Sequence, residues 1–199
     1  MLNNGMYVFG NGESRLSINL NNLDGIKIGC NAIHRDYVVD HLVCADRRMV
    51  NEAIDNNVND YALVYTREDW IAQYKKFKNI KVVPKLPYTG TARWDEPFNW
   101  GSGPYAVLLA ATLCKGPTVC LIGFDLYSPT ATVNNVYKGS SNYDDATKRA
   151  VDPRYWIHQI GMVFECHPNL NFVVYNTETF KLPEAWNCPN VLLDKISSL

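Results

Sequence analysis

Apolar runs of strand length alternate along the chain with segments whose apolar residues recur at helical spacing. The strand-length runs are residues 6–9, 26–30, 41–45, 61–65, 80–83, 118–124 and 172–175. The segments with helical spacing are residues 47–56, 68–77, 104–114 and 153–166. This alternation predicts an α/β fold: a single Rossmann-like domain over residues 1–199, with a mostly parallel sheet and helices on both faces.

Residues 125–152 form the longest stretch without a clear apolar period, and they are rich in Ser, Asn, Asp, Tyr and Gly. A connection of this length without its own secondary structure is usually either a functional lid or disordered. Open parallel sheets bind ligands beyond the carboxyl ends of their strands, near a switch in strand order. We therefore expect the chemistry in the loops that follow the strands, with 125–152 as a lid segment.

Composition and charge exclude several classes of protein. The chain has 199 residues and a formal net charge of −1, which provides no global field for generic binding to nucleic acid. No apolar stretch approaches about 18 residues, so we expect no membrane span. The first residues lack the pattern of a secretory signal, and the six cysteines include no C-x-x-C pair, so we expect a cytoplasmic protein. Cys166-His167 lacks further ligands at zinc spacing, and we expect no metal.

Glycine and short polar residues follow the first three predicted strands. The first strand is followed by Gly10-Asn11-Gly12-Glu13-Ser14, the second ends in Cys30-Asn31 and the third in Ala45-Asp46. Glycines let a backbone approach a ligand closely, and free N–H groups there can bind phosphate, although a plain strand-to-helix turn has the same pattern. Asn31 and Asp46 can bind a ligand or cap the next helix. Arg15 stands where a dinucleotide fingerprint needs a third glycine, which disfavours NAD.

Two further motifs flank the next elements. Gly101-Ser102-Gly103-Pro104 precedes an apolar run of helical length, so Ser102 can cap that helix. An anion or a sugar hydroxyl at such a helix start gains roughly 0.3 to 1 kcal/mol from the helix dipole. The apolar strand 118–124 opens into Gly123-Phe124-Asp125-Leu126-Tyr127.

Taken in order, these motifs resemble the bacterial sialyltransferases of glycosyltransferase family 42. The matching residues are Gly10-Asn11-Gly12-x-Ser14, Cys30-Asn31, Gly101-Ser102-Gly103 and Gly123-Phe124-Asp125-x-Tyr127. The family's lid carries Gly-Ser-Ser-Tyr; here Gly139-Ser140-Ser141-Asn142-Tyr143 has one extra residue, and Tyr137 is a competing match. Past the lid, Trp156-Ile157-His158 opens the helix on which the family places its catalytic histidine. The resemblance covers roughly residues 6–175.

The resemblance implies transfer of a sugar from a nucleotide-activated donor, preferably CMP-linked, with inversion and without a metal or cofactor. Tyr127 and Tyr143 would donate hydrogen bonds to the departing phosphate, and His158 would take the acceptor proton. The residues expected to bind the donor are Gly10, Asn11, Gly12, Ser14, Asn31, Asp46, Gly101, Ser102, Gly103, Gly123, Asp125 and Tyr137. The family commonly forms tetramers, so a homo-oligomer is one expectation. The identity of the acceptor is left open.

The chain also departs from the family pattern. Asp46 stands where the family has an asparagine, and a carboxylate accepts hydrogen bonds without donating them. Residues 47–98 are shorter than the corresponding acceptor-side region of the family. These departures leave two alternatives: a CMP-sugar hydrolase or other nucleotide phosphotransferase on the same pocket, and a catalytically inactive nucleotide-binding protein. His158 also has a purely structural interpretation, as a histidine at a helix start.

Overall fold

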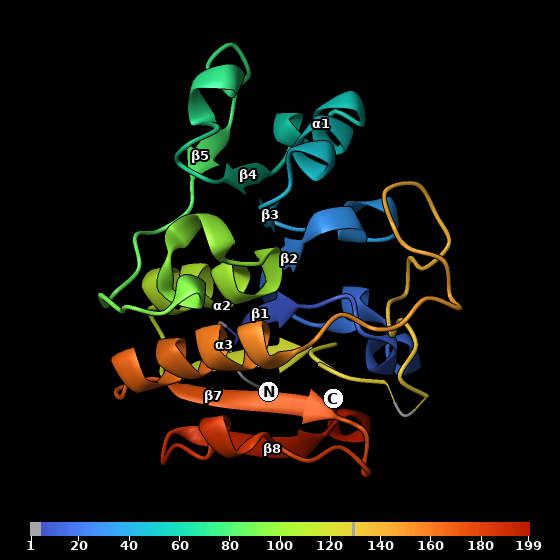
Figure 1. The fold of residues 1–199 in the computed structure, drawn as a ribbon, viewed down its shortest axis with the longest axis vertical. Coiled ribbons are helices and arrows are strands. Elements are labelled where there is room, and N and C mark those ends of the chain that lie inside the picture. Colours follow the sequence, from blue (N-terminus) through green and yellow to red (C-terminus); the bar gives the residue numbers. More distant parts are fainter. Residues whose placement is uncertain (1–4, 129) are drawn as a thin grey trace.

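The computed structural model describes residues 5–128 and 130–199, which build one eight-stranded sheet (Figure 1). Its strands are β1 (Gly5–Phe9), β2 (Gly25–Cys30), β3 (His41–Val43), β4 (Leu63–Thr66), β5 (Ile80–Val82), β6 (Thr118–Ile122), β7 (Asn171–Asn176) and β8 (Val191–Lys195). Every neighbouring pair is parallel, in the order β5-β4-β3-β2-β1-β6-β7-β8. The predicted α/β class with a Rossmann-like arrangement is confirmed, and the sheet is parallel throughout.

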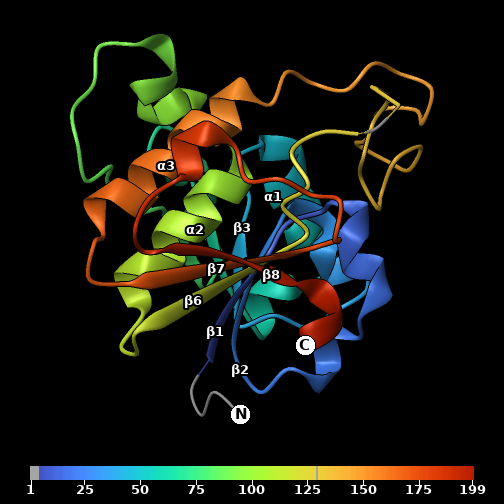
Figure 2. The same ribbon diagram turned by 90° about the horizontal axis from the view of Figure 1, so that it is seen from below.

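Helices cover both faces of this sheet (Figure 2). The longer ones are α1 (Arg47–Asp55), α2 (Ser102–Leu113) and α3 (Arg154–Cys166). One face packs against α2 and α3, and the other against α1 and short 3-10 turns such as η1 (Glu13–Ser17) and η3 (Asn31–Arg35). The central strands β1 and β6 are almost completely buried, as expected for parallel strands with two covered faces.

The structure differs from the sequence prediction in two elements. The helix predicted over 68–77 is only the 3-10 turn Ile71–Tyr74. Trp70, Tyr74 and Phe77 do pack against the core, but the chain between them forms only this short turn and not a continuous helix. The edge strand β8 was not predicted from the apolar pattern, because only Val191 among its five residues is buried.

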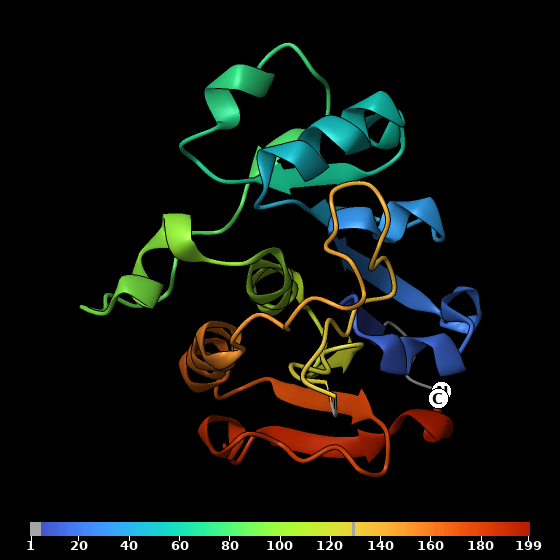
Figure 3. The same cartoon turned by 45° about the vertical axis from the view of Figure 1, so that its right-hand side comes forward.

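The strand order reverses between β1 and β6, since β2 to β5 lie on one side of β1 and β6 to β8 on the other. In its described part, the predicted lid 125–152 contains no helix or ladder strand, only an isolated bridge between Thr132 and Arg149. It leaves β6 at the switch point, reaches η3 and α1, and returns to the start of α3 (Figure 3). We call residues 134–144 of this segment the strap. No described helix is both apolar enough and long enough to traverse a bilayer.

Candidate functional site

The loops after β1 and β6 are packed directly against one another. The N–H groups of Gly10 and Gly12 donate to the carbonyl oxygens of Ile122 and Gly123, each at 2.8 Å. A Cβ on Gly10 would overlap the Gly123 carbonyl, and Gly123 itself has a φ of +75°. These glycines are therefore needed for the two loops to meet, and together they shape the floor of a cavity.

This first cavity has a volume of about 290 Å³ and lies at the switch point of the sheet. Nine of the predicted binding residues line it: Gly10, Asn11, Gly12, Asn31, Gly101, Ser102, Gly103, Gly123 and Asp125. A second cavity of about 300 Å³ shares Asn31, Asn134 and Trp156 with the first and is also lined by Tyr127 and Tyr143. Because the two cavities share walls, we treat them as one cleft.

Two amide side chains in the cleft hold acceptors that the protein does not use. Asn11 donates from Nδ2 to the Cys30 carbonyl and to Tyr143 Oη, both at 3.3 Å. The Oδ1 atoms of Asn11 and Asn31 are buried and have no hydrogen-bond partner among residues 5–128 and 130–199. A buried polar atom left unpaired costs about 1–3 kcal/mol, so such atoms are unusual in folded proteins. A ligand donor that reaches either oxygen would pair it and recover this cost.

The start of α2 adds hydrogen-bond donors to the same cleft. Ser102 Oγ accepts the N–H of Ala45 at 2.8 Å, which leaves its hydroxyl proton free. Within the described chain no side chain caps α2, and the N–H groups of Ser102 and Gly103 have no protein acceptor. Free N–H groups at a helix start, with the helix dipole behind them, favour phosphate and other anions.

The three tyrosines singled out from the sequence have different roles in the structure. Tyr143 Oη accepts from Asn11 Nδ2 and from the Ala32 N–H at 3.4 Å, so its own proton is free. Burial raises the pKa of Tyr143, which keeps this hydroxyl protonated and a donor. Tyr127 lines the second cavity, but it donates to the Lys181 carbonyl at 2.9 Å and stacks on Phe180.

Tyr137, the competing match for the lid tyrosine, lies outside both cavities. Its hydroxyl is 2.8 Å from Nη2 of the buried Arg15 and 2.7 Å from Oδ2 of Asp36. Burial, followed by the hydrogen bond to Asp36, raises the pKa of Tyr137. Tyr137 is thus an anchor of the strap, and of the two candidates Tyr143 is the one that faces the cleft.

Ser14 and Asp46 do not line the cleft either. Ser14 donates its N–H to Asp125 Oδ2 at 2.9 Å and forms a second, short hydrogen bond through its hydroxyl. Asp46 caps α1 by accepting the Arg48 N–H at 2.8 Å, and it pairs with the Arg48 guanidinium at 2.6 Å. Hydrogen bonds from Arg48 hold the pKa of Asp46 below its usual range. Arg48, in contrast, reaches the second cavity.

His158 points away from the cleft. Its Nε2 lies 2.6 Å from Oδ1 of Asp95, and its ring lies beside Trp94. Trp156 and Ile160 on α3 line the first cavity, and a step of two residues turns a side chain by about 200° around a helix. Asp95 also accepts from Tyr88 Oη and the Ala92 N–H. Burial disfavours the charge of Asp95 and is the largest single effect, but the hydrogen bonds from His158, the Ala92 N–H and Tyr88 together outweigh it, so the pKa of Asp95 is lowered.

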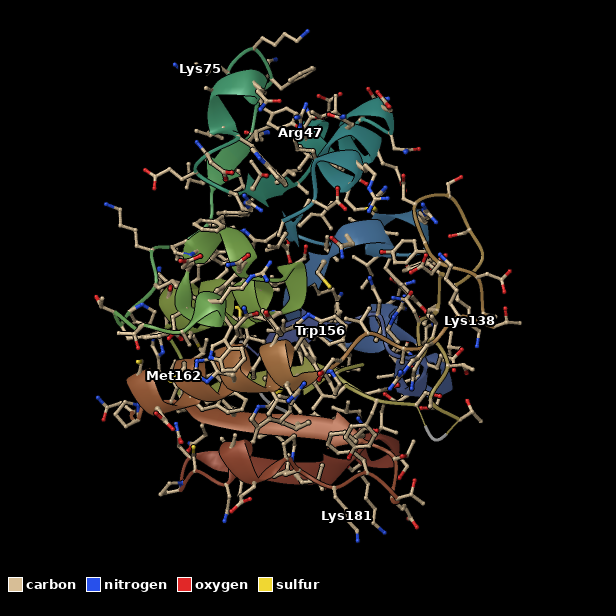
Figure 4. All side chains as sticks on the ribbon, viewed as in Figure 1. Arg47, Lys75, Lys138, Trp156, Met162 and Lys181 are labelled. Carbon is tan, nitrogen blue, oxygen red and sulfur yellow. The ribbon has the colours of Figure 1, made fainter. Side chains whose placement is uncertain are left out.

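Some residues of the site were not among the binding residues predicted from the sequence. Trp156 stands at the start of α3 in the middle of the molecule (Figure 4) and lines both cavities. Asn134 and Asn135 bring the strap to the same walls, and Asp95 is the partner of His158. For the strap, the pair of adjacent asparagines within the polar lid was the feature of the sequence that could have indicated binding residues there. Whether Trp156 faces the cleft, and whether Asp95 meets His158, depends on how α3 packs, which the sequence does not indicate.

The fold and the cleft define the class of protein: a Rossmann-like α/β protein with a polar cleft at the switch point. Comparisons of the chain with protein-family models, with curated proteins and with solved structures gave no match in any of the three. The part of the chain that the structure describes contains no group of three or more His, Cys, Asp or Glu that could hold a metal ion.

Proposed function

We propose that this protein binds a nucleotide-activated sugar in the cleft and transfers the sugar to an acceptor hydroxyl without a metal ion. The observation that carries the proposal is the set of unused hydrogen-bonding groups in the cleft. They are the acceptors Asn11 Oδ1 and Asn31 Oδ1, the hydroxyl protons of Ser102 and Tyr143, and the N–H groups at the start of α2. The preference for a CMP-linked donor rests on the order of the sequence motifs.

The arrangement of these groups suggests how a donor is held. The start of α2 suits the phosphate, because two free N–H groups converge there with the helix dipole. The amide oxygens of Asn11 and Asn31 suit the amino group of a base or the hydroxyls of a ribose, which donate hydrogen bonds. Two adjoining cavities of about 290 and 300 Å³ provide separate space for the nucleoside and for the sugar.

Transfer requires the bond between the anomeric carbon and the phosphate oxygen to break while the acceptor oxygen attacks from the opposite face. The electron pair of the broken bond goes to the phosphate. The Tyr143 hydroxyl and the α2 N–H groups would stabilise this charge without a metal. The motif order makes His158 the proposed acceptor of this proton, at Nδ1 because Asp95 holds Nε2. The ring points away from the cleft in this structure, so the base is the part of the proposal that rests on the sequence motif alone. This assignment requires the acceptor to approach along α3, between the cleft and His158.

The position of His158 also favours a second candidate function, nucleotide binding without turnover. His158 and the neighbouring Gln159 join α3 to residues 94–101, since Gln159 bonds the Trp94 and Asn99 carbonyls. A histidine used only for this contact would leave the cleft a binding site. A hydrolase with water as acceptor is the related enzymatic alternative.

The test is to incubate the protein with CMP, UDP and GDP sugars while measuring both the melting temperature and the release of free nucleotide. Transfer predicts stabilisation by at least one donor and nucleotide release that falls in His158→Ala and in Tyr143→Phe. Stabilisation without release supports the binding protein instead. Release that is equal in His158→Ala shows that another group is the base. If no nucleotide stabilises the protein, the proposal is wrong.

A further inference from the structure

The free hydroxyl of Tyr143 is delivered to the cleft by the strap, which has no secondary structure of its own to hold it in place. Besides single contacts at Asn134, Val136 and Lys138, two sets of contacts fix the strap to the body of the protein. At its first half, Tyr137 binds Arg15 and Asp36. At its second half, the contacts come from Arg35 at the end of η3 and from Glu52 on α1.

Arg35 and Glu52 form a bidentate ion pair. Arg35 donates from Nε and Nη2 to the two oxygens of the Glu52 carboxylate, at 2.6 and 2.8 Å. A planar guanidinium paired in this way is held in a fixed orientation. Hydrogen bonding and charge act in the same direction on both partners, since the pKa of Arg35 is raised and that of Glu52 is lowered. The pair therefore stays ionised at neutral pH.

The same pair binds three successive residues of the strap. Arg35 donates from Nη1 to Ser140 Oγ at 2.7 Å and from Nη2 to the Ser141 carbonyl at 2.9 Å. Glu52 accepts from Asn142 Nδ2 at 2.8 Å. The Arg35 guanidinium also lies 5.7 Å from the centre of the Tyr143 ring, within the range of a cation–π contact. The contacts end at the residue that enters the cleft.

We propose that Arg35 and Glu52 are positioning residues: together they form a clasp that holds the strap closed and thereby keeps the Tyr143 hydroxyl beside Asn11. Neither side chain lines the first or the second cavity, so the clasp acts through the strap and not by touching the ligand. For its effect on a ligand, this inference rests on the proposed nucleotide site. The closed strap itself can be tested without any ligand.

Glu52 is also linked through His34 to Asn31, a second residue that lines the cleft. His34 Nε2 is 3.5 Å from Glu52 Oε1, and His34 Nδ1 is 3.0 Å from the carbonyl oxygen of Asn31. Asn31 has a φ of 52°, a conformation that its surroundings must support. Loss of the Glu52 carboxylate should therefore disturb both Tyr143 and Asn31, whereas loss of Arg35 should disturb the strap alone.

The strap carries its own reporter, because trypsin cleaves after Lys138, which lies on the outer side of the molecule (Figure 4). The experiment measures this cleavage, the melting temperature and the affinity for CMP in the wild-type protein and in Arg35→Ala. An open strap exposes the bond after Lys138, so we expect cleavage about tenfold faster in the variant. Affinity should fall by roughly tenfold, because apparent affinity scales with the fraction of closed molecules.

Three further variants distinguish three effects: positioning of Tyr143 by the clasp, direct contact of Tyr143 with the ligand, and a general loss of stability. Tyr143→Phe should weaken CMP binding with a smaller effect on cleavage than Arg35→Ala, because it removes only the two long hydrogen bonds to Tyr143 Oη, at 3.3 and 3.4 Å, and leaves the clasp in place. Glu52→Gln, which keeps an acceptor but loses the charge, should show both effects and serves if Arg35→Ala does not fold. Lys195→Ala removes an exposed ion pair with Glu178 outside the cleft and should change neither.

Each outcome supports or overturns the proposed clasp. Faster cleavage together with weaker CMP binding supports the clasp. Unchanged cleavage in Arg35→Ala overturns it, and so does faster cleavage with unchanged affinity, because the strap would then not position anything for the ligand. If the wild-type protein does not bind CMP, the proposed site fails for this nucleotide, and the cleavage rates alone decide whether the clasp exists.

Discussion

Two of the hollows at the carboxyl edge of the sheet differ in how their polar side chains are paired. A hollow of about 650 Å³ lies beyond β4 and β5, lined among others by Arg67, Tyr88 and Tyr105. Arg67 is bonded to Asp69 and the Phe98 carbonyl, Tyr88 to Asp95, and Tyr105 to the Pro97 carbonyl. In the cleft, by contrast, the Oδ1 atoms of Asn11 and Asn31 lack any partner in the described residues.

This difference shows that unused hydrogen-bonding capacity distinguishes a candidate site better than volume does. Fully paired polar groups have already gained their hydrogen bonds within the protein, so a ligand gains little by contacting them. Unpaired buried groups cost stability in the free protein, and a ligand that pairs them recovers that cost. The following substitutions test whether the two hollows differ in this way.

The largest effect on stability is expected from adding a side chain at Gly10, in the floor of the cleft. In Gly10→Ala the new methyl group would overlap the Gly123 carbonyl, which neither loop can move away from without breaking a strand-end hydrogen bond. We expect a loss of about 3 kcal/mol or more in the free energy of unfolding, measured by denaturant titration. Gly139→Ala is a control without crowding, since its Cβ has no described atom within 4 Å; its φ of +75° carries a backbone cost of its own that Gly10 does not have. Its cost should stay near 1 kcal/mol. Equal losses would contradict the close packing of the loops.

The next effect concerns binding. Asn11→Leu removes the unpaired acceptor and the bonds to Cys30 and Tyr143, so CMP affinity should fall by about tenfold to a hundredfold, equivalent to about 1–3 kcal/mol. Lys85→Ala, in the wall of the larger hollow, should leave the affinity unchanged. Isothermal titration of both variants provides the measurement. A loss of affinity in Lys85→Ala but not in Asn11→Leu would move the site to the larger hollow.

The sequence was sufficient to locate the cleft because parallel strands end at one edge. The motifs after β1, β2 and β6 and the start of α2 had to meet wherever those strands became neighbours, and the apolar pattern predicted those strands. Seven strands and three helices followed from the same pattern. The edge strand β8 was not predicted because four of its five residues are exposed. The helix predicted over 68–77 was wrong, because the helical spacing of its apolar residues corresponds only to the short turn Ile71–Tyr74.

The directions of individual side chains could not be predicted in the same way. Whether His158 or Trp156 faces the cleft depends on the rotation of α3 against α2, and a step of two residues reverses the answer. The choice between Tyr137 and Tyr143 depends on the path of the strap, which the long-range contacts to Arg15 and Arg35 determine. Pairings between residues more than 100 positions apart leave no local signal in the sequence.

A smaller effect should separate two serines that the sequence treats alike. Ser14→Ala removes a hydroxyl that is bonded to Asp125, so we expect about 1 kcal/mol of lost stability and unchanged CMP affinity. Ser102→Ala removes a free donor from the cleft and also leaves the Ala45 N–H without its acceptor, so stability and affinity should both fall. Thermal unfolding with and without CMP measures the two quantities. A ligand effect confined to Ser14→Ala would reverse the assignment of these hydroxyls.

The smallest expected effect is the pH dependence of the strap. Hydrogen bonds from Arg35 lower the pKa of Glu52, so the clasp is fully formed above the ordinary glutamate range and is lost as the pH falls through the lowered value. Burial lowers the pKa of His34, and once protonated this neighbour favours the charged form of Glu52. Hydrogen exchange at the Tyr143 amide, which is bonded to the Ser140 carbonyl, should therefore lose protection only below the usual glutamate range, after correction for the intrinsic exchange rate.

In Arg35→Ala, protection should already be weak at neutral pH, because the strap has lost two direct contacts along with the charge partner of Glu52. Protection that is the same in both proteins at every pH would show that Tyr137 and Arg15 hold the strap unaided.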